Sequence, residues 1–326
     1  MDRRIKELYN ESILMEAAAR YGVEPAKVRK LGGFESFIYE YSKNGKDHIL
    51  RITHSFHRSM DDLTAEMEWV RYLTENGGDV AGAVYSENGL LAEKISSGDS
   101  YFIASSIEKA PGKPPGRDVW DRTLFRQWGR AVGKLHRLTK SYIPVKKPRF
   151  QWFDEYLIRD FDKYIPTEQE KIIEKTGETI TRIKSFKTDR DSYGLIHTDV
   201  HQGNFFHDNG RITIFDFDDC AYKHFVSDIA IAIFYSMMSR NDFNSKEDFA
   251  EFFLHHFMDG YSTENVIGDI WMRRLPDFLK LREVVLYTAI CRSMSPDEPD
   301  EWCTNYLNKH RPTIENDVPV LARDLV

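Results

Sequence analysis

The sequence predicts an α+β protein with two lobes, a smaller one built on an antiparallel sheet and a larger one that is mainly helical. Its 326 residues exceed what one compact core usually holds. Apolar side chains alternate near 37–41, as in a strand, but recur at three- and four-residue steps over most of the second half of the chain. The stretch 108-EKAPGKPPG-116 separates the two patterns. We therefore expect a first lobe at 1–108, a hinge at 109–116 and a second lobe at 117–326.

The first lobe is expected to begin with an amphipathic helix at 5–21, where apolar residues fall near helical spacing. A β-hairpin follows at 30–53, because aromatic residues alternate along its first half and 43-KNGK-46 is suited to a turn. A helix at 61–75 and strands at 89–95 and 101–107 complete this lobe.

The second lobe is predicted to open with a strongly amphipathic helix at 121–139. Residues 155–186 are also mostly helical in pattern. Two short apolar runs, at 194–197 and 211–217, then interrupt the helices as strand candidates, and the pattern is helical again from 226 to 308.

Composition and charge narrow the class of protein. The net charge of −7 gives no basic excess to neutralise phosphates, so we expect no nucleic-acid partner. The longest apolar run, 229-IAIAIFYSMM-238, is too short to span a bilayer, and the N-terminus lacks the apolar region of a signal peptide. The three cysteines, Cys220, Cys291 and Cys303, form no CxxC pair. These features predict a cytoplasmic protein without a membrane association or a disulfide framework.

One segment combines polar residues at a spacing that suggests chemistry. Asp199 follows His197 by two positions, Asn204 follows Asp199 by five, and Asp216 closes the next apolar strand candidate. A strand–turn–strand between Asn204 and Asp216 would bring these two side chains to one end of a hairpin. An amide oxygen and a carboxylate suit a hard cation such as Mg²⁺, and Asp199 remains to accept a proton.

Two other metal chemistries could use the same segment. A zinc site from His197, His201 and His207 lacks both the HExxH spacing and a cysteine partner, so we disfavour it. A metal-dependent hydrolase that uses the acids of 197–218 is a second alternative, which Mg²⁺–ATP binding would distinguish from a kinase.

The combined pattern resembles a known family. Kinases carry a catalytic loop HRDxxxxN followed by a metal-binding DFG. The segments 196-IHTDVHQGNFF-206, 214-IFDFDDC-220 and 226-VSDIA-230 resemble the aminoglycoside phosphotransferase/choline kinase family, the small-molecule branch of the protein-kinase-like fold. This resemblance implies a two-lobed kinase-like fold, ATP and Mg²⁺ as cofactors, and transfer of the γ-phosphoryl group to a hydroxyl of a small molecule.

The resemblance also implies roles for residues of the second lobe. Asp199 would be the catalytic base, and His197 would brace the catalytic loop. Asn204 and Asp216 would hold Mg²⁺ against the ATP phosphates, while Asp218 would either assist a second Mg²⁺ or solvate the loop. A further aspartate, Asp228, would hydrogen-bond the catalytic-loop backbone, cap the following helix, or do both.

In the first lobe, 31-LGGFES-36 resembles the loop that covers the nucleotide, with Gly32, Gly33 and Ser36 as phosphate-contacting residues. Arg51 stands where the family has a lysine, and this departure replaces a point charge by a longer, planar group.

Glu66 is the predicted partner of Arg51, because it lies beside the packed face of its helix, whereas Glu68 projects about 200° away. The backbone near Glu108 and Ala110 would pair with adenine.

The acceptor is expected to be small, because only eleven residues separate Asp216 from Asp228 and no protein-kinase activation segment fits there. The acidic segment 295–307, with Asp297, Glu298 and Trp302, would suit a cationic amine or an aminoglycoside-like compound, unless it is a solvated loop. Trp152, Trp271 and Tyr261 belong either to the acceptor pocket or to the core. The alternatives are a catalytically weak kinase-like binding protein (a pseudokinase or a coat-type protein) and a protein Ser/Thr kinase. We expect a monomer or a homodimer.

Overall fold

The computed structural model describes residues 2–116, 119–239, 243–294 and 300–323. The chain divides into two compact units, each assembled from three segments. Unit 1 comprises Met1–Pro114, Ser141–Arg149 and Phe205–Asp218, and unit 2 comprises Pro115–Lys140, Phe150–Asn204 and Asp219–Val326. Among the helices of the described residues, none combines the length and apolar character needed to cross a membrane.

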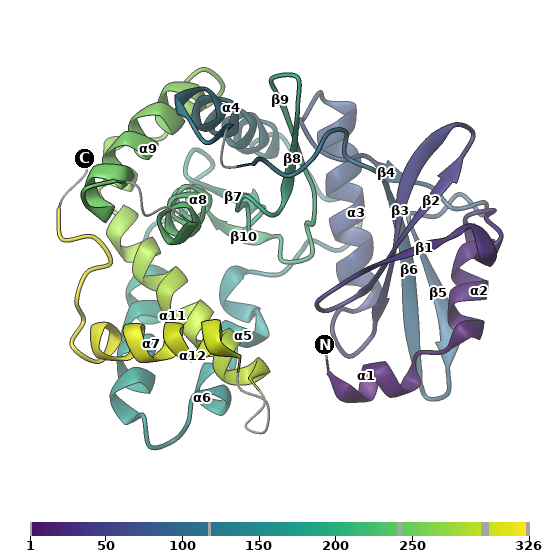
Figure 1. Cartoon of the computed structure of the whole chain (residues 1–326), viewed down its shortest axis with the longest axis horizontal. Helices are drawn as coiled ribbons and strands as arrows, with labels where there is room; N and C mark the ends of the chain where they lie inside the picture. Colours follow the sequence, from purple (N-terminus) through teal and green to yellow (C-terminus); the bar gives the residue numbers. More distant parts are fainter. Residues whose placement is uncertain (1, 117–118, 240–242, 295–299, 324–326) are drawn as a thin grey trace. The chain divides into compact units, whose positions relative to one another are not determined.

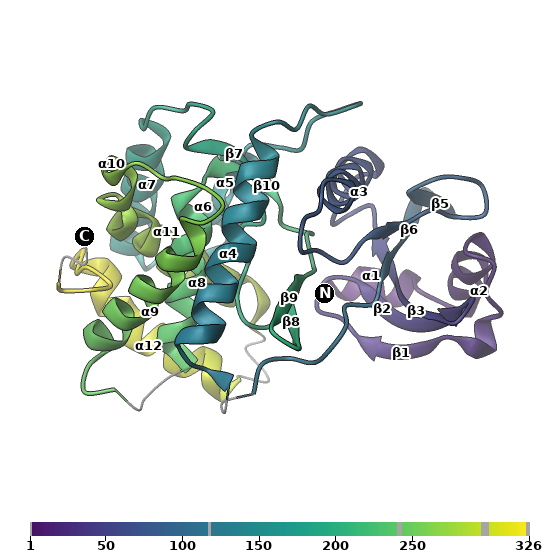
Figure 2. The same ribbon diagram turned by 90° about the horizontal axis from the view of Figure 1, so that it is seen from above.

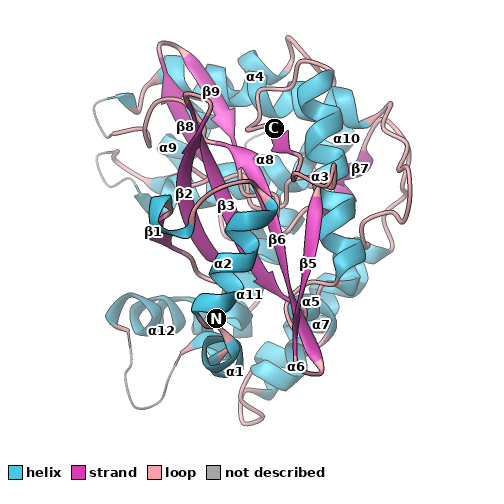
Figure 3. Cartoon of the chain, turned by 90° about the vertical axis from the view of Figure 1, so that its right-hand side faces the viewer, coloured by secondary structure: helices cyan, strands magenta, loops and turns pink. Residues whose placement is uncertain are grey.

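Unit 1 is built on a six-stranded antiparallel sheet with strand order β1-β2-β3-β6-β4, where β5 pairs with β6. Its strands are β1 (Arg29–Gly32), β2 (Phe37–Lys43), β3 (Lys46–His54), β4 (Ala83–Val84), β5 (Ala92–Ser97) and β6 (Ser100–Glu108). Its helices are α1 (Arg3–Leu8), α2 (Glu11–Arg20) and α3 (Met60–Glu75). In Figure 1, α3 lies on one side of the strands and α2 on the other, and Figure 3 shows α2 lying across them.

The alternation of side chains along each strand sorts the two faces of this sheet. Phe37, Tyr39 and Tyr41 of β2 are buried in one core together with Phe102 of β6 and the apolar residues of α1 and α2. The neighbouring β6 residue, Ile103, points to the opposite face and packs with Leu63 of α3 and Ala92 of β5. The two-residue period of a strand therefore gives the sheet one face under α1 and α2 and another under α3.

The helix predicted at 5–21 is instead two helices. Asn10 accepts hydrogen bonds from the backbone N–H groups of Ser12 and Ile13, so it caps a new helix at Glu11. Tyr9 is extended, which allows its ring to stack on Phe37 at a centroid distance of 3.7 Å. The strong preference of asparagine for the N-cap position outweighs the continuous apolar period here.

Unit 2 is mainly helical, as predicted, and also holds a two-stranded antiparallel sheet of β7 (Tyr193–Ile196) and β10 (Ala221–His224). The segment 155–186, predicted to be mostly helical, forms three helices, α5, α6 and α7. The helices of this unit are α4 (Arg122–Thr139), α5 (Tyr156–Arg159), α6 (Phe161–Tyr164), α7 (Glu170–Lys184), α8 (Val226–Ser239), α9 (Lys246–Tyr261), α10 (Asp269–Met272), α11 (Leu275–Ser293) and α12 (Glu301–Glu315).

Close contact between α4 and α9 depends on glycine. The two helices run side by side in Figures 1 and 2. A Cβ at Gly129 would lie 1.8 Å from the carbonyl oxygen of Phe257, and a Cβ at Gly260 would lie 1.8 Å from that of Arg126. Neither contact is sterically possible, so these two positions accept only glycine at this helix spacing.

The predicted hairpin around 204–216 is present as β8 (Phe205–Asp208) paired with β9 (Arg211–Ile214). It belongs to unit 1, although about 170 residues of chain separate it from β1, the first strand of that unit. The backbone N–H of Ala81 donates to Ile214 O at 2.8 Å, and that of His207 donates to Lys113 O at 2.9 Å. Backbone hydrogen bonds to residues distant in sequence thus hold the hairpin in unit 1, and no local sequence pattern predicts them.

The buried imidazole of His224 in β10 predicts a loss of stability in mild acid. Burial lowers the pKa of His224 to about 4, since the ring is 1% exposed and lies against Trp271 and Phe278. In the unfolded chain the imidazole takes up a proton near pH 6.5, whereas in the folded chain it does so only near pH 4. The stabilisation by the neutral, buried ring is therefore complete above pH 6.5 and is lost as the pH falls toward 4. Between these limits the free energy of unfolding should fall by at most about 3 kcal/mol.

Urea denaturation of wild type and His224→Gln between pH 7.5 and 4.5 checks this expectation. The variant should have a shallower pH dependence, because glutamine can still donate to Lys187 O, which His224 Nε2 contacts at 3.2 Å, but does not titrate. His255→Gln, at an exposed position of α9, is the matched control and should keep the wild-type slope. Equal slopes for His224→Gln and wild type would contradict the prediction.

Candidate active site

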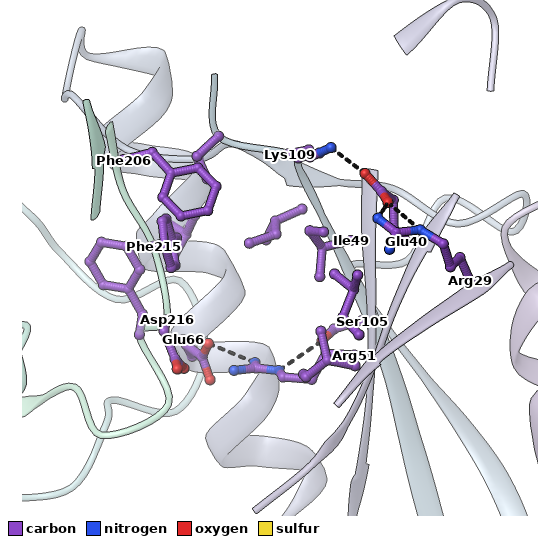
Figure 4. A pocket seen from close by; sticks show the side chains of 17 residues that line it. Arg29, Glu40, Ile49, Arg51, Glu66, Ser105, Lys109, Phe206, Phe215 and Asp216 are labelled. Carbon is purple, nitrogen blue, oxygen red and sulfur yellow. Dashed lines mark hydrogen bonds and ion pairs between the residues drawn. The ribbon is translucent and has the colours of Figure 1, made fainter. Parts of the chain in front are cut away.

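A cavity of about 400 Å³ opens on the α3 face of the unit 1 sheet. Two rows of paired residues line it from the sheet: Ile38, Arg51 and Ser105 lie side by side, as do Glu40, Ile49 and Ile107. Figure 4 shows Phe206 and Phe215 of the β8–β9 hairpin on the wall opposite Ile49 and Ser105. Its lining is completed by Arg29, Leu31, Glu66, Val70, Ala81, Lys109, Ala110, Asp216 and Phe217.

At one end of this cavity, Arg51 forms the predicted ion pair with Glu66. The Arg51 Nη2 to Glu66 Oε1 distance is 2.6 Å, and the Glu66 side chain is 3% exposed. Burial alone would lower the pKa of Arg51, but the charges of Glu66, Asp218 and Asp216 outweigh it and raise the pKa further. A fixed cation therefore lies beside the Asp216 carboxylate at this end of the cavity.

Asp216 and Asp218 differ in their surroundings. Asp216 lines the cavity, and its backbone is left-handed with φ of 65°, a conformation that aspartate and asparagine tolerate better than most residues. Asp218 is held by basic side chains instead: its carboxylate lies 2.6 Å from His57 Nε2, 3.5 Å from Arg58 Nη2 and 3.7 Å from Arg51 Nη1. Although burial opposes ionisation, His57 and Arg58 hold the pKa of Asp218 well below its usual range.

The glycine-rich loop is shaped by Gly33. Its φ is 122°, and a Cβ there would lie 1.8 Å from the carbonyl oxygen of Ser36. The Ser36 hydroxyl is 2.8 Å from the hydroxyl of Thr53, and the residue is 6% exposed, so this side chain ties the loop to β3. Gly32 also has a positive φ, of 131°, but has open space where a Cβ would lie.

Lys109, Glu40 and Arg29 are at the other end of the cavity (Figure 4). Hydrogen bonds from Lys109 and Arg29 lower the pKa of the Glu40 carboxyl between them. Glu108 ends β6, and Ala110 lines the cavity. The backbone N–H of Ala110 donates to no residue of the described chain, although Ala110 is 6% exposed. A buried donor facing a cavity suits a ligand acceptor atom such as a purine nitrogen.

Replacing Arg51 should weaken nucleotide binding. Arg51→Met is expected to raise the Kd of Mg²⁺–ATP by about 10- to 100-fold, since a hydrogen bond to a charged group contributes roughly 1.5–3 kcal/mol. The same change leaves the Glu66 carboxylate buried and unpaired, which should also destabilise the protein. The double variant Arg51→Met/Glu66→Gln separates these effects. Its stability, measured by urea denaturation, should return toward that of wild type, whereas its affinity for Mg²⁺–ATP, measured by isothermal titration, should not. If the double variant bound ATP like wild type, the assignment of Arg51 would be wrong.

In unit 2, Asp228 hydrogen-bonds the backbone of the loop that precedes Asp199, the contact that the family resemblance implies. Its carboxylate accepts hydrogen bonds from the backbone N–H of His197 at 3.1 Å and of Thr198 at 2.8 Å. Helix α8 already begins at Val226, so Asp228 lies inside the first turn and is not its N-cap. Thr198 has φ of 65°, which is strained for a β-branched residue, and its hydroxyl also donates to Asp219 O at 2.6 Å.

A buried chain of polar groups supports Asp228 from behind. His136 Nε2 is 3.1 Å from the Asp228 carboxylate, and His136 Nδ1 is 2.9 Å from the Tyr261 hydroxyl. Tyr261, one of the three aromatic residues left between pocket and core, is 0% exposed and belongs to the core. His197 is also fully buried, and its Nδ1 accepts the backbone N–H of Asp199 at 3.3 Å, which suits a brace.

Asp199 is surrounded by four groups that orient it. Its Oδ1 accepts a hydrogen bond from Arg282 Nη2 at 2.6 Å, and its Oδ2 accepts one from Asn204 Nδ2 at 3.1 Å. His201 Nδ1 accepts the Gly203 N–H at 2.9 Å, which leaves the proton on Nε2, 3.4 Å from Asp199 Oδ2. The Tyr235 hydroxyl accepts a hydrogen bond from Arg282 Nη2, and the Tyr235 ring contacts the ring of His201.

The charge of Arg282 dominates the electrostatics at Asp199. Burial would raise the pKa of Asp199, but Arg282 and then His201 lower it to about 2. Asp199 is therefore a permanent anion at neutral pH. Asn204 Nδ2 also donates to Asp199 O at 2.9 Å, so its amide oxygen is the atom left for a cation.

Sequence patterns did not reveal Arg282, Tyr235 or His201 as neighbours of Asp199. Arg282 lies 83 positions away in α11, and no local motif marks it. The sequence predicts no role for His201, because its spacing to His197 and His207 fits no metal site.

The acidic segment is only partly within the described chain. Asp297 and Glu298 lie outside the described residues. Asp300 caps α12 by accepting the Cys303 N–H at 2.8 Å, and Trp302 is 52% exposed and stacks on Tyr306. In the described part, then, one acid of this segment has a structural role.

Comparison with known proteins identifies close relatives. The family model described as "Phosphotransferase enzyme family" matches residues 28–265. The chain is 37% identical to amicoumacin kinase of Bacillus subtilis (strain 168) over 98% of this chain and 96% of that protein. A solved structure of amicoumacin kinase hAmiN in complex with AMP-PNP, Ca²⁺ and Ami has a TM-score of 0.94 and 33% identity, covering 100% of this chain and 99% of that one. A microcompartment-associated aminopropanol kinase shares the fold, with a TM-score of 0.76 at 18% identity over 94% of this chain and 97% of that one.

Proposed function

The chain belongs to the phosphotransferase enzyme family, and from this premise we propose that it phosphorylates a hydroxyl group of amicoumacin or a closely similar compound. It is an ATP-dependent small-molecule phosphotransferase of the protein-kinase-like fold, and it uses a divalent metal ion. The acceptor assignment rests on one observation: identity of 33–37% to two amicoumacin kinases extends over essentially the whole chain, including the unit that holds Asp199.

The proposed roles follow the surroundings of each residue. Ala110 N–H and the backbone of Glu108 pair with adenine, and Gly32, Gly33 and Ser36 form the loop over the phosphates. Arg51, fixed by Glu66, provides a cation to the phosphate oxygens.

Asn204 and Asp216 hold Mg²⁺, with Asp218 as the anchor of the metal-binding loop or a further ligand. The oxygen atoms that Asn204 and Asp216 offer are the type that Mg²⁺ prefers. When bound, the metal neutralises charge on the phosphate oxygens.

Asp199 orients the acceptor hydroxyl and takes its proton. A carboxyl with a pKa of about 2 is a weak base, so it accepts the proton late, after bond formation to phosphorus has made the hydroxyl acidic. Its main contribution is then position: Arg282, Asn204 and His197 fix the carboxylate before the acceptor binds. Phosphoryl transfer depends mostly on such positioning and on charge neutralisation.

A coupled ADP-release assay tests the proposal. Amicoumacin, aminoglycosides, choline, ethanolamine, 3-amino-1-propanol and homoserine are compared at saturating Mg²⁺–ATP, with product mass measured to locate one added phosphoryl group. Amicoumacin should give the highest kcat/KM. Turnover of another compound with no turnover of amicoumacin would overturn the acceptor assignment while leaving the kinase activity intact.

We also propose a cytoplasmic location. Cys220, Cys291 and Cys303 are all free thiols, as is usual in a reducing compartment, and the reaction draws on ATP. A pseudokinase is disfavoured because Asp199, Asn204 and Asp216 are all present.

A further inference from the structure

One oxygen of the Glu66 carboxylate is buried without a hydrogen-bond partner. Glu66 lies in α3, and its side chain is 3% exposed. Its Oε1 accepts the hydrogen bond from Arg51 Nη2 at 2.6 Å, whereas no described residue donates a hydrogen bond to its Oε2. A carboxylate oxygen that is removed from water and left unpaired is costly, so such an atom calls for a ligand that the protein itself does not provide.

This oxygen belongs to a residue that lines the cavity assigned to the nucleotide. Glu66 and Asp216 both line the cavity, and both charges act on Arg51. Figure 4 shows Glu66 and Asp216 together at the end of the cavity where the Arg51 guanidinium lies. Since Asp216 is the proposed metal ligand, the free oxygen of Glu66 is at the end of the cavity that would hold the divalent cation.

Packing contacts hold α3 against the loop that carries the proposed metal ligand. The ring of Trp69, three positions after Glu66 in α3, packs edge-on against the ring of Phe217 at a centroid distance of 5.3 Å. The Arg51 guanidinium, which pairs with Glu66 through Nη2, also lies 3.7 Å from Asp218 Oδ1 through Nη1. Glu66 is thereby fixed relative to the metal-binding loop by a ring contact and by a shared cation.

The charges at this end of the cavity favour a cation. Arg51 supplies one positive charge against the two carboxylates of Glu66 and Asp216, while Asp218 is engaged by other basic side chains. Phosphate groups alone would be repelled by the two carboxylates. Mg²⁺ reverses that repulsion, and the waters that it usually keeps need oxygen acceptors nearby.

A second buried glutamate of α3 shows that burial alone does not make such a site. Glu68 is 7% exposed and also has a buried Oε2 without a hydrogen-bond partner. Among the described residues, those that line the cavity include Glu66 but not Glu68. The two side chains thus match in residue type, helix and burial, and they differ in access to a ligand in the cavity.

We propose that Glu66 supplies its free Oε2 to the coordination sphere of the divalent cation held by Asp216, as the acceptor of a metal-bound water. The other oxygen keeps the ion pair with Arg51, so one carboxylate connects the fixed cation to the metal. This inference rests on the proposed function, in which Asp216 holds the metal. It goes beyond that function by giving Glu66 a role in metal binding as well as in holding Arg51.

Titration of Glu66→Gln with AMP-PNP, in Mg²⁺ and in EDTA, tests this role. Glutamine can still accept the hydrogen bond from Arg51 through its amide oxygen, but the NH₂ group that replaces Oε2 cannot accept one from a metal-bound water. In Mg²⁺ the Kd should rise about tenfold, the lower range for partners of metal ligands, and in EDTA it should not rise. A rise in EDTA as large as that in Mg²⁺, or no rise in Mg²⁺, would overturn the proposal.

Binding of Mn²⁺ gives a second readout that needs no turnover. Mn²⁺ is titrated into each variant with AMP-PNP, the protein in excess, and the free ion is measured by electron paramagnetic resonance. The Kd of Mn²⁺, which shares the preference of Mg²⁺ for oxygen ligands, should rise about tenfold for Glu66→Gln. Glu68→Gln is the matched control and should leave it within twofold. Unchanged Mn²⁺ affinity of Glu66→Gln would contradict the proposal.

Two further variants keep the result unambiguous. If Glu66→Gln does not fold because Arg51 has lost its anionic partner, Arg51→Met/Glu66→Gln is compared with Arg51→Met, and no additional loss of Mn²⁺ affinity counts against the role of Glu66. Asp216→Asn separates this inference from the proposed function. A metal-dependent loss for Asp216→Asn alone would leave the metal with Asp216 and remove Glu66 from it, whereas no such loss for either variant would overturn both assignments.

Discussion

Asp199→Asn is expected to lower kcat by about 10²- to 10⁴-fold, the range that general-base residues contribute. Asparagine keeps the size of the side chain but removes the charge that orients and finally deprotonates the acceptor hydroxyl. Nucleotide affinity should stay within about twofold, because the cavity that we assign to the nucleotide is lined entirely by residues of unit 1. Rapid-quench transfer to amicoumacin and calorimetric titration with Mg²⁺–AMP-PNP measure the two quantities.

The variant also leaves Arg282 without its anionic partner, so some loss of stability is expected and must be separated from catalysis. Asp191→Asn is a suitable control: it removes an exposed carboxylate of unit 2 that pairs with Lys140 at 3.1 Å. Its kcat should equal that of wild type. A kcat for Asp199→Asn within a few-fold of wild type, on a protein that is folded at the assay temperature, would show that Asp199 is not the base.

Asp216→Asn is expected to weaken binding of Mg²⁺–ATP by about 100-fold or more, because a metal ligand supplies several kcal/mol and 2.7 kcal/mol corresponds to about 100-fold. Asparagine is chosen because position 216 has φ of 65°, which it accepts as readily as aspartate does. Without metal, the effect of the substitution on ATP affinity should reverse. The Asp216 carboxylate of the wild type then repels the phosphates, so the variant should bind metal-free ATP as tightly as wild type or more tightly.

Titrations with ATP in Mg²⁺ and in EDTA measure both halves of this prediction. Asp208→Asn, at an exposed position of the same β8–β9 hairpin, removes an equal charge away from the cavity and should change neither affinity. Equal losses with and without metal for Asp216→Asn would indicate damage to the cavity instead of loss of a metal ligand.

Several elements of unit 1 were predictable because their signals are local. The alternation Phe37, Tyr39, Tyr41 is buried on one face of β2, and the helix predicted at 61–75 is α3, capped by Ser59. The Arg51–Glu66 ion pair was also predicted, since one residue lies on a strand and the other beside the packed face of a helix. By contrast, the break between α1 and α2 depends on Asn10 and on the stacking of Tyr9 against Phe37, a residue distant in sequence.

The sequence by itself determined the two-part α+β architecture and the kinase-like family, and it singled out Asp199, Asn204 and Asp216 as candidate site residues, because these depend on side-chain period and short spacings. Only the tertiary structure decided what surrounds them. The β8–β9 hairpin pairs with backbone from Asp79–Ala81 and Lys113, and Arg282 reaches Asp199 across 83 positions of chain. Such contacts join segments that lie far apart in the sequence, and no periodic pattern of residues predicts them. The charge around Asp199 is therefore fixed only in the folded structure.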